Sequence, residues 1–442
     1  MRVLALDVGT SSARTRVYDE RAECVPGVGH QERYTSTRGH SGRLGEFDAA
    51  ELLAVARDAM RESRRVLDDP VDAVAISSFW HSLVCLDRRG RPITPLLTWR
   101  QLDVAAAVPL DSAAVHARTG CPLHPSFWPM KIAGLKATGV RAARYVSFSD
   151  LLTGGRTSLS MASGTGLLGL DGRWDGELLE TLGVREEQLP ELSDELVLGD
   201  GAAANLGSGV LGRKRAALTI GTSGALRMVH EPSVPRPGLF LYRLDDERVC
   251  EGGSISDGGN LLDWLERLAG SVETAGMADE PSPPLDFLTL LGGERSPGWN
   301  AGARGIVSGL SFETTARDLV RAALEGVAYR LAEIGELLPE VEEIVGSGGA
   351  LHHNPDWAQI LADVLERPVT LSAVTEASAR GAALLALERL GGSPPPAPLG
   401  RRFEPRPERF QAHRSARERQ RLLYETVASS RSRTSPRAAS AM

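Results

Sequence analysis

Short apolar runs and longer amphipathic stretches alternate along the chain. The first apolar run covers residues 3–6 and is followed by a polar turn from Asp7 to Ser12 and a second strand-like run over residues 14–18. Apolar runs that flank a Gly-Thr-Ser sequence are typical of two strands joined by a tight turn. The pattern therefore predicts a β-hairpin at the start of the sequence.

The rest of the pattern predicts strands that alternate with helices. In the first half it predicts a helix over residues 48–67 and a buried strand over 71–77; in the second half it predicts a helix over 314–338, a strand over 343–345, and helices around 357–365 and 377–390. This alternation indicates an α/β fold. Six prolines follow the strand over 71–77 within the first half and predict loops and short helices that face a substrate: Pro92, Pro95, Pro109, Pro122, Pro125 and Pro129.

The opening pattern occurs a second time. Residues 216–229 (AALTIGTSGALRMV) again show an apolar strand, a Gly-Thr-Ser turn and a strand that contains an arginine. Two such repeats predict a duplicated fold with a cleft between its halves and a boundary near residues 207–215. A Pro/Gly-rich linker over 391–400 leads to residues 401–442, where eleven arginines and four glutamates predict a terminal helix and a disordered end. The aromatic residues there are too sparse for an RNA-stacking platform.

Composition narrows the class of protein. A chain of 442 residues is long enough for two or three domains, and 42% hydrophobic with 24% charged residues is globular. The net charge of −7 argues against a nucleic-acid-binding surface. None of the three lysines follows a glycine in a Walker-A motif. Four widely spaced cysteines and the lack of a long apolar run favour a cytoplasmic protein without a membrane span.

The two Gly-Thr-Ser turns are the strongest chemical feature. The backbone N–H groups and hydroxyls of such a turn suit phosphate oxygens, although the same residues also make an ordinary hairpin turn. Asp7 precedes the first turn, and its carboxylate would repel phosphate. We therefore expect Asp7 to hold Mg²⁺, through water.

Two glycine-rich segments have different contexts. Gly207, Gly209 and Gly212 match a dinucleotide fingerprint in spacing, but a helical run precedes them and a strand follows, which is the wrong order. Gly348 and Gly349 instead follow a predicted strand and precede a helix. Glycines in that context let a flat ligand approach the backbone, and a plain strand-to-helix loop is the alternative.

Two side chains are candidates for chemistry. Asp200 precedes a helix of small residues, so it is either the N-cap of that helix or a general base that accepts the proton of an attacking hydroxyl. His81, beside Trp80, is either a partner for a sugar hydroxyl or a buried structural histidine.

Taken together, these features resemble the FGGY carbohydrate kinase family, and its gluconokinase-like branch most closely. The most specific match is Gly305-x-Val307-x-Gly309-Leu310 followed by residues 318–325 (DLVRAALE). Residues 293–305 (GERSPGWNAGARG) are similar to a loop of the family near the nucleotide. Further blocks are similar to gluconokinase-like sequences and lie at residues 119–125, 200–207 and 252–264.

The resemblance implies two ribonuclease H-like (actin-like) domains, with ATP and Mg²⁺ in the cleft between them. It implies a sugar-binding domain over residues 1–208, a nucleotide-binding domain over 209–392 and a linker, helix and tail over 393–442. It makes Asp200 the general base and Asp7 the metal-side carboxylate. It places ATP against Gly9, Thr10, Ser11, Gly221, Thr222, Ser223, Asn300, Gly348 and Gly349, and the sugar against Trp80, His81, Gln101, Asp103 and Asp200.

Two positions depart from the family pattern. Asp103 stands where an arginine is expected, and Ser158 stands where an aspartate is expected. An aspartate repels an anionic substrate, whereas Arg100 nearby could supply a positive charge. The resemblance implies an ATP-dependent kinase for a sugar acid, gluconate first. A kinase for a neutral sugar or polyol of the xylulose, glycerol or ribitol type is the alternative, and a non-catalytic binding protein is a further one. The partner is a small molecule, and a homodimer is left open.

Overall fold

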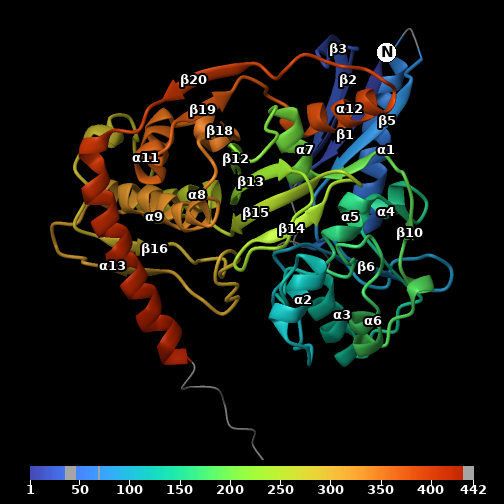
Figure 1. Ribbon diagram of the computed structural model, residues 1–442, viewed down its shortest axis with the longest axis horizontal. Helices are drawn as coiled ribbons and strands as arrows, with labels where there is room; N and C mark the ends of the chain where they lie inside the picture. The colour runs from blue at the N-terminus through green and yellow to red at the C-terminus, as the bar shows by residue number, and fades with distance from the viewer. Residues whose placement is uncertain (35–45, 68–69, 432–442) are drawn as a thin grey trace, which may run out of the picture. The chain divides into compact units, whose positions relative to one another are not determined.

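The computed structural model describes residues 1–34, 46–67 and 70–431 (Figure 1). Its strands are β1 (Val3–Val8), β2 (Ser12–Tyr18), β3 (Cys24–Arg33), β4 (Glu46–Phe47), β5 (Ala73–Ser78), β6 (Val84–Leu86), β7 (Leu96–Leu97), β8 (Arg144–Val146), β9 (Arg156–Thr157), β10 (Glu191–Leu192), β11 (Val197–Gly199), β12 (Arg215–Ile220), β13 (Gly224–His230), β14 (Phe240–Arg243), β15 (Val249–Ile255), β16 (Asp286–Leu288), β17 (Ile306–Ser308), β18 (Glu343–Ser347), β19 (Val369–Ser372) and β20 (Leu399–Phe403). Its α-helices are α1 (Ala49–Arg65), α2 (Ser112–Thr119), α3 (Trp128–Ala137), α4 (Phe148–Leu152), α5 (Leu159–Ser163), α6 (Gly176–Leu182), α7 (Asp200–Gly207), α8 (Gly259–Ala269), α9 (Ala316–Glu336), α10 (Gly349–His353), α11 (Pro355–Leu365), α12 (Ala377–Arg389) and α13 (Pro407–Arg431). The predicted α/β fold is confirmed.

The first large sheet has the strand order β11-β5-β1-β2-β3. β1 pairs antiparallel with β2 and parallel with β5, and all six of its residues are buried. Strands that are buried on both faces read as continuous apolar runs, which explains the opening sequence. The predicted hairpin is confirmed, except that Asp7 lies inside β1, opposite Arg14 of β2, rather than in the turn.

The second large sheet has the order β14-β15-β13-β12-β18-β19-β20. β12 and β13 flank the second Gly-Thr-Ser turn, as predicted. The long predicted helix is α9, whose N-cap Thr315 forms a capping box with Asp318. The predicted linker over 391–400 ends in the first residues of β20, and α13 occupies the predicted terminal helix. The predicted disordered end includes residues 432–442, which lie outside the described residues.

The chain divides into two compact units that are not consecutive halves. The first unit contains Met1–Ala217, Arg227–Gly252 and Ser372–Leu399, and the second contains Leu218–Leu226, Gly253–Leu371 and Gly400–Met442. This division differs from the predicted 1–208 and 209–392. The reason is visible in the core of the first unit, where alanines of α12 pack against β1.

Glycines make that packing possible. A Cβ on Gly207 of α7 would lie 1.7 Å from the carbonyl oxygen of Ala377, and a Cβ on Gly381 of α12 would lie 1.8 Å from that of Ala203. The two helices therefore touch backbone to backbone. Gly207 therefore has a packing role. The helix α7 ends at Gly207 and the strand β12 follows, which confirms that the dinucleotide fingerprint formed by Gly207, Gly209 and Gly212 is a false match.

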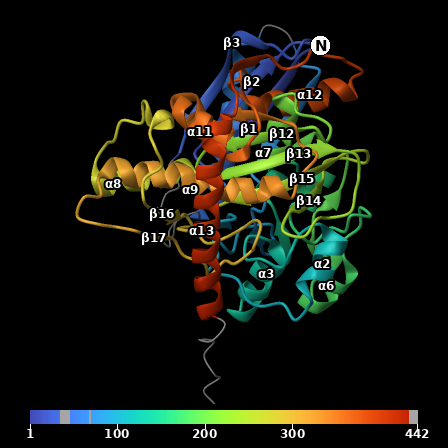
Figure 2. The ribbon, with the colours of Figure 1, turned by 60° about the vertical axis from the view of Figure 1, so that its left-hand side comes forward.

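The proline-rich region is more regular than the sequence predicts. It contains short strands and two helices, α2 and α3, and several of its residues join a buried cluster that includes Trp128, Ile132 and Leu135. In the second unit, α13 packs along α11 and near β16 (Figure 2). No helix within the described residues is both long enough and apolar enough to span a membrane.

Candidate functional site

Asp7 lies at the end of β1 in a mostly buried position. Its Oδ1 accepts a hydrogen bond of 2.9 Å from the hydroxyl of Ser77, and its Oδ2 lies 3.8 Å from Nε of Arg14. Burial raises the pKa of Asp7 to about 6, the cation of Arg14 opposes that rise, and the charge of Asp200 adds to it. Asp7 and Asp200 therefore repel each other electrostatically when both are ionised, and a cation between them would offset this repulsion.

Arg14 joins Asp7 to a glutamate far away in the sequence. One of its terminal nitrogens donates to Glu376 at 2.6 Å, and the other donates to the hydroxyl of Ser12 at 2.9 Å. Its Nε is buried and makes no hydrogen bond within the described residues. Because Asp7 Oδ2 and this Nε are too far apart to bond directly, a water molecule that accepts from Nε and donates to the carboxylate would suit them.

The first Gly-Thr-Ser turn closes the hairpin beside Asp7. The N–H of Gly9 donates to the carbonyl of Ser12, and the hydroxyl of Tyr34 donates to the carbonyl of Gly9 at 2.5 Å. Gly9 and Thr10 are half-buried and Ser11 is exposed. A ligand can therefore reach the turn.

Asp200 is the first residue of α7 and is half-buried. The N-cap position belongs to Gly199, and Asp200 Oδ1 accepts a hydrogen bond of 2.8 Å from the N–H of the adjacent Gly201. The cap hypothesis therefore misplaces the helix start by one residue. An acidic side chain in the first turn is favoured by the helix dipole.

Trp80 forms a wall beside this helix start. A Cβ on Gly199 would lie 1.9 Å from its ring, and a Cβ on Gly164 would lie 2.4 Å from it. The indole N–H donates to the carbonyl of Ser160 at 3.0 Å, and the ring meets Tyr242 edge to face. Small residues at these two positions therefore let the indole lie directly against the backbone.

His81 follows Trp80 in a left-handed conformation with φ +67°. Its Nδ1 lies 2.7 Å from the carbonyl oxygen of Gly164, and its ring packs edge to face on Phe127. A non-glycine residue with this φ is uncommon and is often found at functional sites. His81 is mostly buried, so the structural alternative accounts for Nδ1.

Gln101 is buried, whereas Asp103 two residues later is exposed. The Oε1 of Gln101 accepts from the N–H and from the hydroxyl of Thr98, both at 3.3 Å. Beneath this turn lies Lys131 of α3, fully buried, whose ammonium donates to the carbonyls of Thr98 at 2.6 Å and Ser126 at 3.0 Å.

The sequence pattern does not single out Lys131. The feature that could have revealed it is its position inside an apolar helix, in a chain that has three lysines.

Ser158 is the N-cap of α5, with its hydroxyl accepting from the N–H of Met161 and donating to the carbonyl of Val197. Its side chain therefore has a structural use.

In the second unit, the turn of Gly221, Thr222 and Ser223 lies against the start of α8. The N–H of Gly259 donates to the carbonyl of Gly221 at 2.7 Å, and a Cβ on Gly258 would lie 2.7 Å from the backbone of Ser223. Gly221 and Thr222 are exposed, and the space around Gly221 is open.

Gly348 brings a third element to this turn. It has φ +100°, and a Cβ there would lie 2.2 Å from the carbonyl oxygen of Ile220, directly before the turn. Gly349 then begins α10, and the hydroxyls of Thr219 and Ser347 lie 3.0 Å apart. Backbone of this kind presents N–H groups without side chains in the way, which suits the phosphates and sugar of a nucleotide.

Asn300 lies in the same unit, in a separate loop. Its Oδ1 accepts from the N–H of Gly302 at 3.1 Å, and its carbonyl accepts from the N–H of Glu294. Glu294 in turn is buried and pairs with Arg330 and with the hydroxyl of Tyr424. The structure therefore shows a turn-forming role for Asn300.

The structure thus collects the predicted residues into two groups. Asp7, Asp200, Trp80, His81 and Gln101 belong to the first unit; the second turn, Gly348, Gly349 and Asn300 belong to the second. No cluster of three or more His, Cys, Asp or Glu suited to a metal ion occurs in the described part of the chain. One carboxylate is nevertheless sufficient for Mg²⁺ when a nucleotide supplies further oxygens.

Comparisons with known proteins cover most of the chain. Residues 2–197 match the N-terminal domain of the FGGY family of carbohydrate kinases, and residues 216–388 match the C-terminal domain. A gluconokinase of Bacillus subtilis (strain 168) is 29% identical, with 88% of each chain covered. A glycerol kinase of Deinococcus radiodurans is 30% identical, with 95% of each chain covered. A solved ligand-bound xylulose kinase from Lactobacillus acidophilus shares the fold with a TM-score of 0.87 at 23% identity, over 98% of this chain and all of that one.

Proposed function

The chain belongs to the FGGY family of carbohydrate kinases, and on that premise we propose that it transfers the γ-phosphoryl group of ATP to a primary hydroxyl of gluconate. Its relatives act on small molecules of different kinds, among them gluconate, glycerol and xylulose, so the substrate must be argued from this chain. A cytoplasmic location remains a prediction.

The observation that carries the kinase proposal is the pair of interacting carboxylates in the first unit. Asp200, at the start of α7, accepts the proton of the substrate hydroxyl, which makes that oxygen a better nucleophile. A positioned general base typically contributes about 10²- to 10⁴-fold to the rate. Trp80 packs against the backbone that holds Asp200 and forms a rigid wall for the sugar.

Asp7 and Arg14 suit a metal–phosphate ligand. The ionised Asp7 is favoured by a nearby cation, and the buried Nε of Arg14 is a donor without an acceptor in the described residues. Mg²⁺, when bound with ATP, would neutralise charge that develops on the phosphates. Asp7 would hold it through water, and the Gly-Thr-Ser turns would donate N–H and hydroxyl groups to phosphate oxygens.

The exposure of Asp103 weakens the objection that its negative charge raises against an anionic substrate. Because Asp103 is exposed, water and salt screen its charge, and it opposes an anionic substrate less than the sequence alone suggests. The ammonium of Lys131 is buried beneath the turn of Thr98 and Gln101, where a low dielectric strengthens its field. Arg100, half-buried over the ring of Trp99 at 5.5 Å, is a second cation. These charges support a sugar acid over a neutral polyol.

A panel of substrates tests the proposal. We expect kcat/KM for gluconate, measured by coupled ADP detection, to exceed the values for xylulose, glycerol and ribitol. Arg100→Ala should reduce the gluconate value by about tenfold, which is what one charge-assisted contact contributes, and should leave the neutral sugars unchanged. A wild type that acts only on neutral sugars, with gluconate use appearing in Asp103→Arg, would refute the gluconate assignment.

A further inference from the structure

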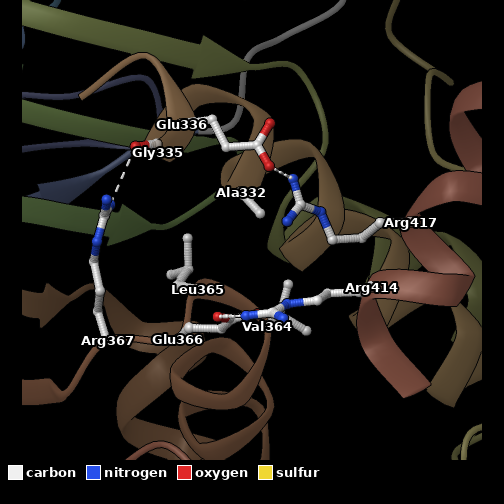
Figure 3. A pocket seen from close by; sticks show the side chains of 9 residues that line it. All are labelled: Ala332, Gly335, Glu336, Val364, Leu365, Glu366, Arg367, Arg414 and Arg417. Atoms are coloured by element: carbon white, nitrogen blue, oxygen red, sulfur yellow. Dashed lines mark hydrogen bonds and ion pairs between the residues drawn. The ribbon is translucent and has the colours of Figure 1, made fainter. Parts of the chain in front are cut away.

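Two of the cavities in the described part of the chain differ in how their charges are used. The first, of about 450 Å³, lies where α9 and α11 end beside α13 (Figure 3). Its three arginines are already engaged: Arg414 pairs with Glu366, Arg417 pairs with Glu336, and Arg367 donates to the carbonyl of Gly335. The pairs of Arg414 and Arg417 fasten α13 to the ends of α11 and α9.

The second cavity, of about 490 Å³, lies in the first unit between β2, the turn before β3 and the start of α12. Its volume is in the range of small-molecule sites. Its apolar lining includes Pro395, Pro396 and Pro398. Its polar lining includes Arg16 and Tyr18 of β2, Glu376 directly before α12 and Arg380 within α12.

Arg380 is a buried cation that contacts no carboxylate of the described residues. Its exposed fraction is 5%, and its guanidinium donates to three backbone carbonyls, those of Ala22, Gly207 and Pro395. Burial lowers the pKa of Arg380, as expected for a cation that is removed from water. An arginine has five N–H donors, so this arrangement leaves two of them for a ligand.

Tyr18 adds a hydroxyl on the same cavity. The residue is 3% exposed and makes no hydrogen bond to any described residue. Buried tyrosine hydroxyls usually have a partner, and burial raises the pKa of Tyr18 well above its ordinary value. The hydroxyl is therefore a neutral donor that lacks an acceptor.

Arg16 supplies a second cation that is only loosely paired. Its guanidinium donates to the carbonyl of Thr15 at 2.8 Å and lies 3.5 Å from Oε1 of Glu376. The other oxygen of Glu376 is held by Arg14 at 2.6 Å. Of the remaining charges, Glu23 and Arg21 pair with each other in an exposed position at the edge. The interior of the cavity thus has more positive charge than negative.

We propose that this cavity binds a small organic anion, a carboxylate or phosphate ester whose oxygens meet Arg16, Arg380 and the hydroxyl of Tyr18 and whose carbon skeleton lies on the prolines. The proposal does not depend on the substrate assignment. Glu376, which contacts both Arg16 of the cavity and Arg14 beside Asp7, gives an occupied cavity a direct connection to the candidate active site.

Cys24 provides a probe, because it lines the cavity and is exposed, whereas Cys85, Cys121 and Cys250 are buried. The experiment measures the rate at which N-ethylmaleimide labels Cys24 in the full chain, by intact mass, with 3-phosphoglycerate or citrate added. Glycerol with NaCl at matched ionic strength is the control. We expect both anions, at about 10 mM, to slow labelling saturably by about threefold or more, and the control to have no effect.

Two variants show whether the protection is specific. Tyr18→Phe removes a hydroxyl that bonds to nothing in the described protein, so it should fold normally and keep its basal activity, while the half-protecting concentration of anion rises about threefold to tenfold. Arg16→Gln should raise the half-protecting concentration of anion further than Tyr18→Phe does. Tyr145→Phe, at another buried tyrosine of the same unit, is the matched control and should behave as the wild type.

Two results would overturn the proposal. The first is labelling of Cys24 at an unchanged rate with both anions. The second is protection that is the same in the wild type, Tyr18→Phe and Arg16→Gln, because the anions would then act elsewhere on the surface.

Discussion

The two Gly-Thr-Ser hairpins share a sequence pattern but lie in contrasting surroundings. The first, between β1 and β2, stands beside a chain of charges that runs from the buried Asp7 through the half-buried Arg14 to the half-buried Glu376. The second, between β12 and β13, stands against bare backbone, where Gly258, Gly259 and Gly348 approach so closely that side chains would collide. The same local turn therefore serves different chemistry, and the neighbouring elements decide which.

The difference assigns tasks to the two groups of residues. A buried carboxylate with a raised pKa, such as Asp7, is suited to holding a cation, and a half-buried carboxylate at a helix start, such as Asp200, is suited to accepting a proton; both roles affect kcat. Closely packed glycine backbone is suited to binding an anion through N–H groups, which affects the affinity for nucleotide. Substitutions in the charged region should therefore change mainly kcat, and substitutions in the glycine region should change mainly the affinity for nucleotide.

The largest effect is expected from the charged region. Asp200→Asn should lower kcat by about 10²- to 10⁴-fold, because the amide cannot accept the proton of the attacking hydroxyl. Steady-state assays with coupled ADP detection measure this. A variant that keeps more than about a tenth of the wild-type kcat would show that Asp200 is not the general base.

A smaller effect is expected from the glycine region. Gly221→Val should raise KM for ATP by about tenfold, because a branched side chain would obstruct the open face of the turn. Gly176→Val, at another glycine with open space around it, is the matched control and should leave KM unchanged. Gly207 is unsuited as a control, since any side chain there would separate α7 from α12. Equal increases at 221 and 176 would contradict the assignment.

The smallest effect is expected at the outer end of the charge network. Glu376→Gln weakens the hold on Arg14, which can then move toward Asp7 and compete with a cation there. The Mg²⁺ concentration for half-maximal rate should rise by about threefold to fivefold, which is what a partly exposed ion pair contributes. Glu388→Gln breaks a comparable pair on the same helix, with Arg248, and should not change the Mg²⁺ requirement. An unchanged Mg²⁺ requirement in both variants would show that Glu376 does not influence the cation site at Asp7.

The sequence predicts those parts of the fold that depend on neighbouring residues. The hairpins, the long helix and the Gly348 turn follow from local periodicity and turn chemistry, and they appear as predicted. Asp7 is placed in a turn by the sequence because it is polar, yet it lies in a buried strand, where Ser77 donates a hydrogen bond to its carboxylate.

Contacts between distant residues account for what the sequence does not predict. The membership of α12 in the first unit depends on alanines that pack against β1 and on glycines that meet α7, and all of these partners are far from α12 in the sequence. The exposure of Asp103 and the burial of Lys131 likewise depend on how α3 packs beneath the turn at Thr98. Periodicity carries no information about such contacts, so the charge balance of the substrate region could not be predicted.

The most direct test of this account is the dissociation constant of a non-hydrolysable ATP analogue, measured by calorimetry side by side in Asp200→Asn and Gly221→Val. The account predicts that Asp200→Asn binds the analogue within about twofold of the wild type although its turnover is lost, and that Gly221→Val binds it about tenfold more weakly. Wild-type affinity in Gly221→Val, together with weakened binding in Asp200→Asn, would contradict the division between the charged region and the glycine region.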